Sequence, residues 1–411
     1  MPWKETCPVN QRVLFMAAVK AGEQTIAGLC RLYEVSPKTA YKWIARYDAG
    51  GPAALEDRSR APKSSPQATS EEVTGLIVDV RKRHPTWGPR KIVSWIRARA
   101  PSVEIPAPST CGALLKRLGL VSPRKRRKSA ASVPAVGIRP PYAAPNAVWC
   151  ADFKGDFRTK NGSRCYPLTI SDGFSRLLIR VEAVLRPDYD HVWPVFEEAF
   201  REYGLPFSLR TDNGPPFATR AMHGLSRLAV RLLKLRIWPD RIEPGHPEQN
   251  GRHERMHRTL KNETARPPQR DLREQQAAFD RFREEYNCER PHEALHQRPP
   301  LSVYISSPRK YPRRLEPFAY PEHLRVFKVN CNGQIRWRTG AILQLGLALI
   351  GEYIGFEQVD DGTWNVMLGE HQIATLEEQL GSRMIPVPLV RPSWTEPTTV
   401  PTGGLPLRVQ E

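Results

Sequence analysis

Proline-rich segments without apolar periodicity interrupt this chain in three places, and they constrain its fold more than any other feature. They cover residues 50–70, 121–145 and 386–411. Proline lacks an amide hydrogen and disfavours helix in the residue before it, so we interpret these segments as linkers and a tail. Because 411 residues also exceed one ordinary hydrophobic core, we expect several domains.

The pieces between these segments differ in periodicity, which predicts a multidomain chain of mixed classes. Two N-terminal pieces have helical periodicity, the central piece mixes strands with helices, and the last piece has only short alternating strands. We therefore predict all-α helix-turn-helix units, a central α/β domain around a mixed sheet, and a small all-β barrel. The central piece predicts an antiparallel meander of three strands with an Asn-Gly hairpin at 160–163, and later a helix at about 251–264. The last piece predicts strands around turns at Asn332-Gly333 and Asp361-Gly362. The predicted segments are helical domains at 1–52 and 70–120, a basic Pro-rich linker at 121–145, the α/β domain at 146–310, the barrel at 320–385 and a Pro-rich tail at 386–411.

Positive charge points to a polyanionic partner. The chain has 62 Lys and Arg against 43 Asp and Glu, a formal charge of +19. Nucleic acid is the first candidate and an anionic membrane surface the second. No run approaches the roughly 18 apolar residues of a membrane span, and the first residues lack the apolar stretch of a secretory signal, so we expect a cytoplasmic protein with no membrane partner.

Seven scattered cysteines without a CxxC pair indicate reduced thiols and no zinc module.

The first helical piece carries a helix-turn-helix pattern. A helix from Thr25 to about Tyr33 precedes a short turn, and Ser36 followed by Pro37 predicts the start of a second helix. The apolar face of that second helix consists of Ala40, Trp43, Ile44 and Tyr47, and its opposite face of Lys38, Lys42 and Arg46. These three cations are candidates for entering a DNA major groove. A short helical bundle with a solvated cationic face would show the same pattern.

A second set of helices is predicted at 70–83, 89–97 and 109–118. Arg90 and Lys91 make it a candidate second DNA-reading module, although a plain helical spacer fits nearly as well. The linker then opens with five adjacent cations, which suit contact with phosphates independently of DNA sequence or, alternatively, a solubilising tether. They are Arg124, Lys125, Arg126, Arg127 and Lys128.

Two aspartates of the central piece lie at positions where burying an unpaired carboxylate would cost folding free energy. Asp152 lies within a predicted core strand, and Asp212 ends another strand just before a turn. Each needs a cation or hydrogen-bond donors, although Asp212 before Asn-Gly also suits a simple Asx-turn. If a glutamate following the loop at 244–250 joined them, the three hard oxygen donors would suit magnesium or manganese beside a polyanion. Two such ions activate a water or a 3′ hydroxyl in phosphoryl transfer.

Four stretches in order carry a family resemblance: "WCADFKG", "RTDNGPPF", "HPEQNGRHERMHRTLK" and "YNCERPHEAL". They resemble the DDE transposases of bacterial insertion sequences and the related retroviral integrases, over about residues 146–305. The resemblance implies a ribonuclease H-like integrase core, with Asp152 and Asp212 as the first two acids of a triad that binds two Mg²⁺ or Mn²⁺ ions. It also implies cleavage of duplex DNA at the element ends, strand transfer into target DNA, and a homo-oligomer in the DNA complex.

The third acid is either Glu248 or Glu254. The family often places about 35 residues between the second aspartate and the glutamate, and Glu248 meets that spacing, whereas 41 residues separate Asp212 from Glu254. The family glutamate also follows a Gly-containing turn by three positions inside a helix, which matches Glu254. Glu254 lies in the predicted helix, which restricts its side-chain conformation, whereas Glu248 lies in a loop flanked by Pro and Gly. We therefore favour Glu254 as the metal ligand. Arg258 and Lys261 then share its helix face and match the family's DNA-gripping cations, although Arg258 also suits an ion pair with Glu254.

Other interpretations of the same residues are weaker. His246, His253 and His257 invite a zinc site, but "HERMH" resembles no zinc motif with a suitable third ligand. Two other functions compete with a transposase that acts on DNA at the bacterial nucleoid. One is a DNA-binding regulator with an inactive integrase-like domain, which the presence of all three acids disfavours. The other is a ribonuclease H-type nuclease, which the helix-turn-helix units disfavour because they serve duplex DNA.

Overall fold

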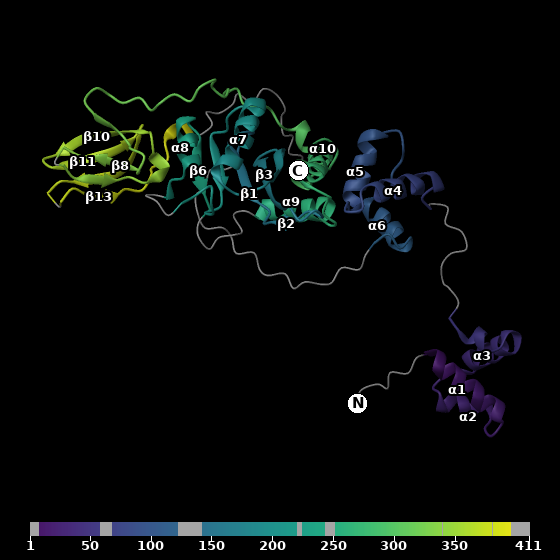
Figure 1. Cartoon of the computed structure of the whole chain (residues 1–411). Coiled ribbons are helices and arrows are strands. Elements are labelled where there is room, and N and C mark those ends of the chain that lie inside the picture. Colours follow the sequence, from purple (N-terminus) through teal and green to yellow (C-terminus); the bar gives the residue numbers. More distant parts are fainter. Residues whose placement is uncertain are drawn as a thin grey trace, which may run out of the picture. The chain divides into compact units, whose positions relative to one another are not determined.

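The chain forms two compact units, residues 1–70 and 71–411 (Figure 1). The computed structural model describes residues 8–57, 68–121, 142–219, 224–242, 251–338, 340–379 and 381–395. The five linker cations at 124–128, together with His246 and Glu248, lie outside these residues. Within them, no helix is both long and apolar enough to cross a membrane.

The N-terminal unit contains α1 (Pro8–Ala21), α2 (Ile26–Leu32), α3 (Pro37–Gly50) and a 3₁₀ turn at Pro52–Leu55. The predicted start of α3 is confirmed, because the Ser36 side chain accepts a hydrogen bond from the amide of Thr39 and Pro37 occupies the first turn. The apolar face of α3 packs into a small core with α1 and α2. Helix α1 is an addition to the predicted pair.

The second helical set consists of α4 (Glu71–Arg83), α5 (Pro89–Arg99) and α6 (Pro108–Arg117). Each helix agrees with its predicted range to within two residues at either end. Their apolar faces enclose a shared core that contains Ile77, Trp87 and Ile92. Arg81 closes this core by donating hydrogen bonds to the backbone oxygens of Trp87 and Leu120.

A six-stranded mixed sheet forms the centre of the second unit. Its strands are β1 (Val148–Phe153), β2 (Phe157–Arg158), β3 (Arg164–Asp172), β4 (Leu178–Val184), β5 (Ser208–Thr211) and β6 (Trp238–Arg241). The order is β4-β3-β1-β5-β6, and β2 also pairs with β3. The predicted antiparallel meander is confirmed in β1, β3 and β4, while β5 and β6 run parallel to β1. The predicted Asn-Gly hairpin joins β2 to β3.

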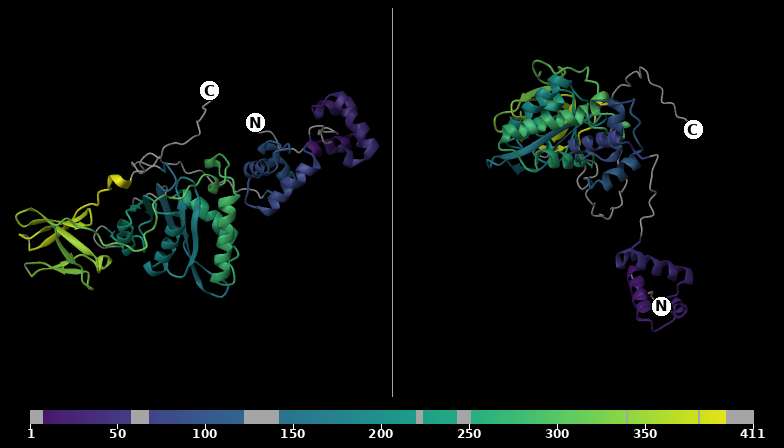
Figure 2. Two further views of the ribbon diagram at one scale, coloured as in Figure 1. Left: turned by 90° about the horizontal axis from the view of Figure 1, so that it is seen from above. Right: turned by 90° about the vertical axis from the view of Figure 1, so that its right-hand side faces the viewer.

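Helices cover both faces of this sheet, and the alternation of side chains along β1 sorts its residues between the two faces. Trp149 and Ala151 face the core formed with α7 (Tyr189–Tyr203) and α8 (Arg227–Lys234). The opposite core contains side chains of α9 (Gly251–Thr264) and α10 (Leu272–Cys288), which lie along the sheet in Figure 2. Asp152, between Ala151 and Phe153, therefore projects toward the face that α9 and α10 cover.

The C-terminal region consists mainly of strands, as predicted, with a 3₁₀ turn at Leu347–Leu349, and the strands described between residues 325 and 386 do not form a closed barrel. Strands β7 (Arg325–Lys328), β10 (Tyr353–Asp360), β11 (Thr363–Leu368), β12 (His371–Glu377) and β13 (Arg383–Pro386) form an antiparallel sheet. Its order, β13-β12-β11-β10-β7, has two ends, and β8 (Gln334–Arg336) pairs separately with β9 (Ile342–Gln344). The structure thus supports the predicted β region without showing a closed barrel, because short strands do not by themselves specify closure.

The two predicted turns of this region behave differently. Asp361-Gly362 joins β10 to β11 as a hairpin, as predicted. Asn332-Gly333 also forms a turn, but the strands on its two sides do not pair with each other. Strand β7 pairs with β10, and β8 pairs with β9. The Asn330 side chain accepts hydrogen bonds from the amides of Asn332 and Gln334, which close this turn.

Candidate active site

Two of the three predicted acids follow paired residues of neighbouring strands. In the parallel pairing of β1 with β5, Val148 lies opposite Ser208 and Cys150 opposite Arg210. Asp152 lies two residues after Cys150 on β1, and Asp212 lies two residues after Arg210, directly after the end of β5. A continuation of this register past the last printed pair would set the two carboxylates at the same level. Neighbouring strands lie about 4.8 Å apart, which suits two carboxylates that share a cation.

The turn after β5 fixes Asp212. Its Oδ1 accepts a hydrogen bond of 3.1 Å from the amide of Gly214, and Asn213 donates to the backbone oxygen of Ile242 at 2.8 Å. The Asx-turn considered for Asp212 is therefore present, and it orients the carboxylate. Burial raises the pKa of Asp212 despite the hydrogen bond from Gly214, because desolvation penalises the charged form.

Helix α9 carries the third predicted acid, Glu254, and another residue of this helix lies near Asp152. Glu254 is exposed, whereas His253 and His257 are buried against β3. The Nδ1 atom of His257 lies 3.8 Å from Oδ2 of Asp152, which places this part of α9 next to the carboxylate. Arg258 and Lys261 are also exposed, at the helical spacings that put them on the face of Glu254.

The donor set fits hard divalent ions, but the three acids do not form one cluster. Asp152, Asp212 and Glu254 offer only carboxylate oxygens, which magnesium and manganese prefer. Within the described ranges, no three His, Cys, Asp or Glu side chains converge closely enough to hold a metal ion. The metal site therefore stays a prediction, supported by the strand register that leads to Asp152 and Asp212.

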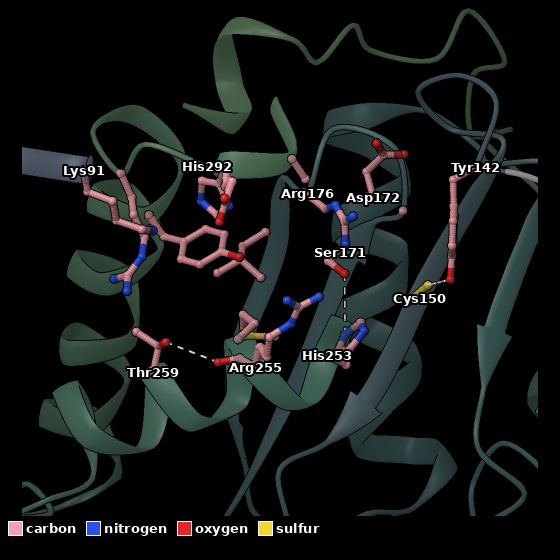
Figure 3. Close-up of a pocket in the computed structure, with 17 residues that line it drawn as sticks. Lys91, Tyr142, Cys150, Ser171, Asp172, Arg176, His253, Arg255, Thr259 and His292 are labelled. Carbon is pink, nitrogen blue, oxygen red and sulfur yellow. Dashed lines mark hydrogen bonds between the residues drawn. The ribbon is translucent and has the colours of Figure 1, made fainter. Parts of the chain in front are cut away.

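The two buried histidines have contacts that the sequence did not reveal. His253 lies 3.5 Å from the Ser171 hydroxyl (Figure 3), and His257 lies 2.7 Å from that of Thr169. Burial lowers the pKa of His253 to about 4 and that of His257 to about 2, so both rings are neutral near pH 7. These contacts with β3 explain why both histidines are buried, and a zinc site is not needed to explain their spacing.

Two of the predicted DNA-reading cations of α3 are exposed and the third is partly so. Lys38 and Lys42 are exposed and Arg46 is half-buried. The Arg46 guanidinium lies 4.7 Å from the centre of the Trp43 ring, and Lys42 lies 5.4 Å from it. Such cation–π contacts hold both side chains near the helix surface, where they still carry their charge.

The predicted cations of α5 contact other parts of the same unit. Arg90 forms an ion pair of 2.6 Å with Glu293. Lys91 is half-buried, and burial together with Arg290 lowers its pKa to about 8. The sequence analysis considered Arg90 and Lys91 as part of an open surface for reading DNA. In the structure they instead lie against the segment that follows α10.

A cavity of about 310 Å³ that the motifs did not indicate lies beside α9 (Figure 3). Its lining is rich in cations and ring side chains, among them Lys91, Arg176, Arg255, Tyr286, Arg290 and His292. These residues come from distant parts of the chain, so no local sequence signal marks the cavity.

Comparisons with known proteins agree with the fold and the helix-turn-helix pattern. Residues 143–247 and 235–300 match models described as integrase core domain. Residues 11–63 match a helix-turn-helix domain and residues 39–115 a homeodomain-like domain. The chain thus carries an integrase core domain and helix-turn-helix domains.

Two curated relatives are insertion element proteins. An uncharacterised IS407 protein of Burkholderia multivorans is 30% identical over 183 residues, which are 44% of this chain and 63% of the relative. An uncharacterised IS476 protein of Xanthomonas euvesicatoria is 26% identical over 245 residues, 57% of this chain and 65% of the relative. The chain therefore spans slightly less than two thirds of the length of these relatives.

Solved integrase structures show a weaker likeness. The HTLV-2 integrase catalytic core domain in complex with magnesium is 17% identical, with a TM-score of 0.32 over 40% of this chain and 99% of that one. A chain of a simian T-cell lymphotropic virus intasome in complex with the PP2A regulatory subunit B56 gamma is 14% identical, with a TM-score of 0.36 over 77% of this chain and 97% of that one.

Proposed function

We propose that this chain, which carries an integrase core domain and helix-turn-helix domains, is a transposase of an insertion element. It binds the ends of the element and catalyses metal-dependent hydrolysis of a DNA strand, which frees a 3′ hydroxyl. This hydroxyl then attacks a phosphodiester of the target, so that the element strand is joined to the target phosphate and a 3′ hydroxyl of the target strand is released. Its partner is duplex DNA, both as element end and as target. The reaction takes place at the chromosome, in the bacterial cytoplasm.

The register of β1 with β5 supports this proposal, because Asp152 and Asp212 each come two residues after the paired residues Cys150 and Arg210. Two half-buried carboxylates side by side are unfavourable unless a cation or a proton separates their charges. Asp152, Asp212 and Glu254 would hold two Mg²⁺ or Mn²⁺ ions, with Glu254 contributed by α9. When bound, such ions supply activation of a water or hydroxyl and stabilise charge on the reacting phosphate.

The protein's own side chains position the DNA in this proposal. Arg258 and Lys261 carry positive charge on the α9 face that also presents Glu254, so they would hold the phosphates flanking the reacting one. Phosphate contacts of this kind set the position of the strand without reading its sequence.

In this proposal the helix-turn-helix units recognise the base sequence of the element ends. Lys38, Lys42 and Arg46 of α3 would contact the element ends, and Arg90 and Lys91 would contribute only when α5 is free of its ion-pair partners. The linker cations Arg124, Lys125, Arg126, Arg127 and Lys128 would add contacts to phosphates, and the C-terminal sheets would add further contacts to DNA or protein. Joining two DNA ends requires two copies, so the DNA complex is a homo-oligomer.

The proposal is tested by cleavage of labelled duplexes that carry the inverted repeats flanking the gene. Asp212→Asn should abolish magnesium-dependent cleavage and leave end binding intact, because it removes a charged metal ligand without changing the side-chain volume. Asp156→Asn is the matched control, since Asp156 pairs with Arg164 at 2.7 Å at a partly exposed position. Cleavage retained in Asp212→Asn contradicts the proposal, and cleavage of RNA–DNA hybrids alone would indicate a ribonuclease H-type nuclease.

A further inference from the structure

The cavity beside α9 gathers positive charge from separate parts of the chain (Figure 3). Its volume of about 310 Å³ lies at the lower end of the range for small-molecule sites, so it can hold one small ligand but no duplex. Four cations line it: Lys91 of α5, Arg176 between β3 and β4, Arg255 of α9 and Arg290 after α10. An anionic ligand is therefore the first candidate for this cavity.

The two acids of the lining already have partners of their own. Glu293 forms the ion pair of 2.6 Å with Arg90. Asp172 accepts hydrogen bonds from the amide of Asn146, at 2.8 Å, and from the amide and hydroxyl of Ser175, both at 2.7 Å. Their negative charge is thus directed to other groups, and the cavity keeps an excess of positive charge.

Lys91 is the cation whose surroundings most favour an anion. It is half-buried, and the two acids near it each pair with another cation: Glu263 with Arg290 at 3.2 Å, and Glu293 with Arg90. Burial and the charge of Arg290 lower the pKa of Lys91 to about 8. A half-buried ammonium group of this kind is stabilised by an anion that enters the cavity.

His292 adds a hydrogen-bonding ring to the same end of the cavity as Lys91 (Figure 3). Burial, together with the charges of Lys91, Arg290 and Arg176, lowers its pKa to about 3, so the ring is neutral near pH 7. Its Nε2 is buried and has no hydrogen-bond partner within the described residues. A ligand oxygen that reaches this nitrogen would gain a hydrogen bond without displacing another one.

The stretch "YNCERPHEAL", which has no role in the proposed function, supplies one wall of the cavity. Asn287 fixes its start to β4, because its side chain accepts a hydrogen bond from the amide of Leu178 at 2.8 Å and donates one to the oxygen of that residue at 2.9 Å. Tyr286, Arg290 and His292 line the cavity next to this anchor. The rings of Tyr286 and His292 pack edge to face, with centres 4.7 Å apart. The stretch thus holds its polar side chains in fixed places around the cavity.

We propose that this cavity binds one phosphate group of a nucleotide-sized ligand, with Lys91 and Arg290 neutralising its charge and His292 donating a hydrogen bond. Phosphate suits the lining because it offers several oxygen acceptors, which bind Arg and Lys through charge-assisted hydrogen bonds. The group can belong to a free nucleotide or to a DNA strand. The inference does not depend on the metal site, and it gives Lys91 a role while α5 lies against the segment after α10.

The test is calorimetric titration of the full chain with inorganic phosphate, in EDTA and without DNA. Lys91→Met removes the ammonium group and keeps a side chain of similar length, so it should weaken phosphate binding about 10-fold. Lys116→Met is the matched control, because Lys116 is exposed on α6 and does not line the cavity. It should leave the affinity within about two-fold of the wild type.

Two further probes identify the source of the phosphate. Deoxyadenosine monophosphate carries a terminal phosphate, and a deoxyadenosine dinucleotide carries a single internal one. Tighter binding of the first indicates a free nucleotide or a strand end, and tighter binding of the second indicates a strand backbone. Either result supports the inference if Lys91→Met weakens the binding.

The inference is overturned if none of the three probes binds, or if Lys91→Met and Lys116→Met weaken binding equally. Should Lys91→Met not fold, as judged by circular dichroism, the wild type decides through the ¹⁵N signals of His292. Phosphate should shift these signals, and unchanged signals would overturn the site. Because phosphate binding is measured without metal, its failure leaves the proposed function standing, and cleavage retained by Asp212→Asn leaves this inference standing.

Discussion

At the scale of single residues, the space around Asp212 is the most sensitive feature of the site. A Cβ added at Gly214 would lie 3.2 Å from Oδ2 of Asp212, closer than an ordinary contact. Gly214→Ala should therefore displace the carboxylate and reduce single-turnover cleavage by roughly ten-fold, because small misplacements of reacting groups are costly. End binding should not change.

A matched glycine provides the control for this substitution. Gly75 lies in α4, and a Cβ there meets nothing within 4 Å. Gly75→Ala should therefore leave the cleavage rate unchanged. Wild-type cleavage by Gly214→Ala would show that the position of the Asp212 carboxylate does not limit the reaction.

The buried histidines of α9 make its stability depend on pH. Because the folded-state pKa values of His253 and His257 are lowered to about 4 and about 2, both rings gain a proton on unfolding once the pH falls below the ordinary value near 6.5. Their contribution to stability is complete above pH 6.5 and declines by about 1.4 kcal/mol per pH unit for each ring as the pH falls toward those values. Hydrogen exchange of α9 at pH 7 and pH 5.5, corrected for intrinsic rates, should show faster opening at pH 5.5. Equal protection of the α9 amides from exchange at pH 7 and pH 5.5 would contradict the conclusion that both histidine rings are buried in their neutral form.

The sequence predicted the two aspartates but not the histidine contacts, for a physical reason. A carboxylate in an apolar strand or at a strand end stands out locally, so Asp152 and Asp212 were identifiable one at a time. The contact of His257 with Thr169 joins residues 88 positions apart, and it depends on how α9 lies across β3. Nothing within "HERMH" specifies that packing, and the spacing of its two histidines suggested only a zinc site, which the lack of a suitable third ligand made weak.

At the scale of elements, the exposed face of α9 is the predicted phosphate contact. Replacing Arg258 or Lys261 with Ala should weaken duplex binding for all DNA sequences alike and reduce the slope of log K against log salt by about 1 for each cation. Fluorescence anisotropy at several salt concentrations measures both effects. Arg281→Ala, at an exposed position of α10, is the control and should change neither quantity. An unchanged slope in both α9 variants would exclude this face from the DNA contact.

Elements with strong local signals were predictable, and elements defined by distant partners were not. Caps and helical periodicity predicted α4, α5, α6 and α9 almost to the residue. Strand β6, "WPDR", has neither alternation nor β-branched residues, and it forms through parallel pairing with β5. The pairing of β8 with β9 was missed for the same reason, since a turn signal does not specify which strand pairs with which.

At the scale of the whole molecule, joining two DNA ends predicts a defined stoichiometry. Mass photometry of the protein with a duplex carrying the element end should show complexes that contain at least two copies of the chain. The free protein, with a formal charge of +19, should assemble poorly by itself at low salt, because like charges repel. A complex with two ends and one copy of the chain would contradict the requirement for an oligomer.

The central claim is that Asp152 and Asp212 share a divalent ion with Glu254. Anomalous diffraction from crystals of the full chain with Mn²⁺ and an element-end duplex tests it most directly. The predicted result is Mn²⁺ bound by the carboxylates of Asp152 and Asp212, with Glu254 of α9 completing the protein ligands. Mn²⁺ bound away from the two aspartates, or bound by them together with Glu248 in place of Glu254, would contradict it.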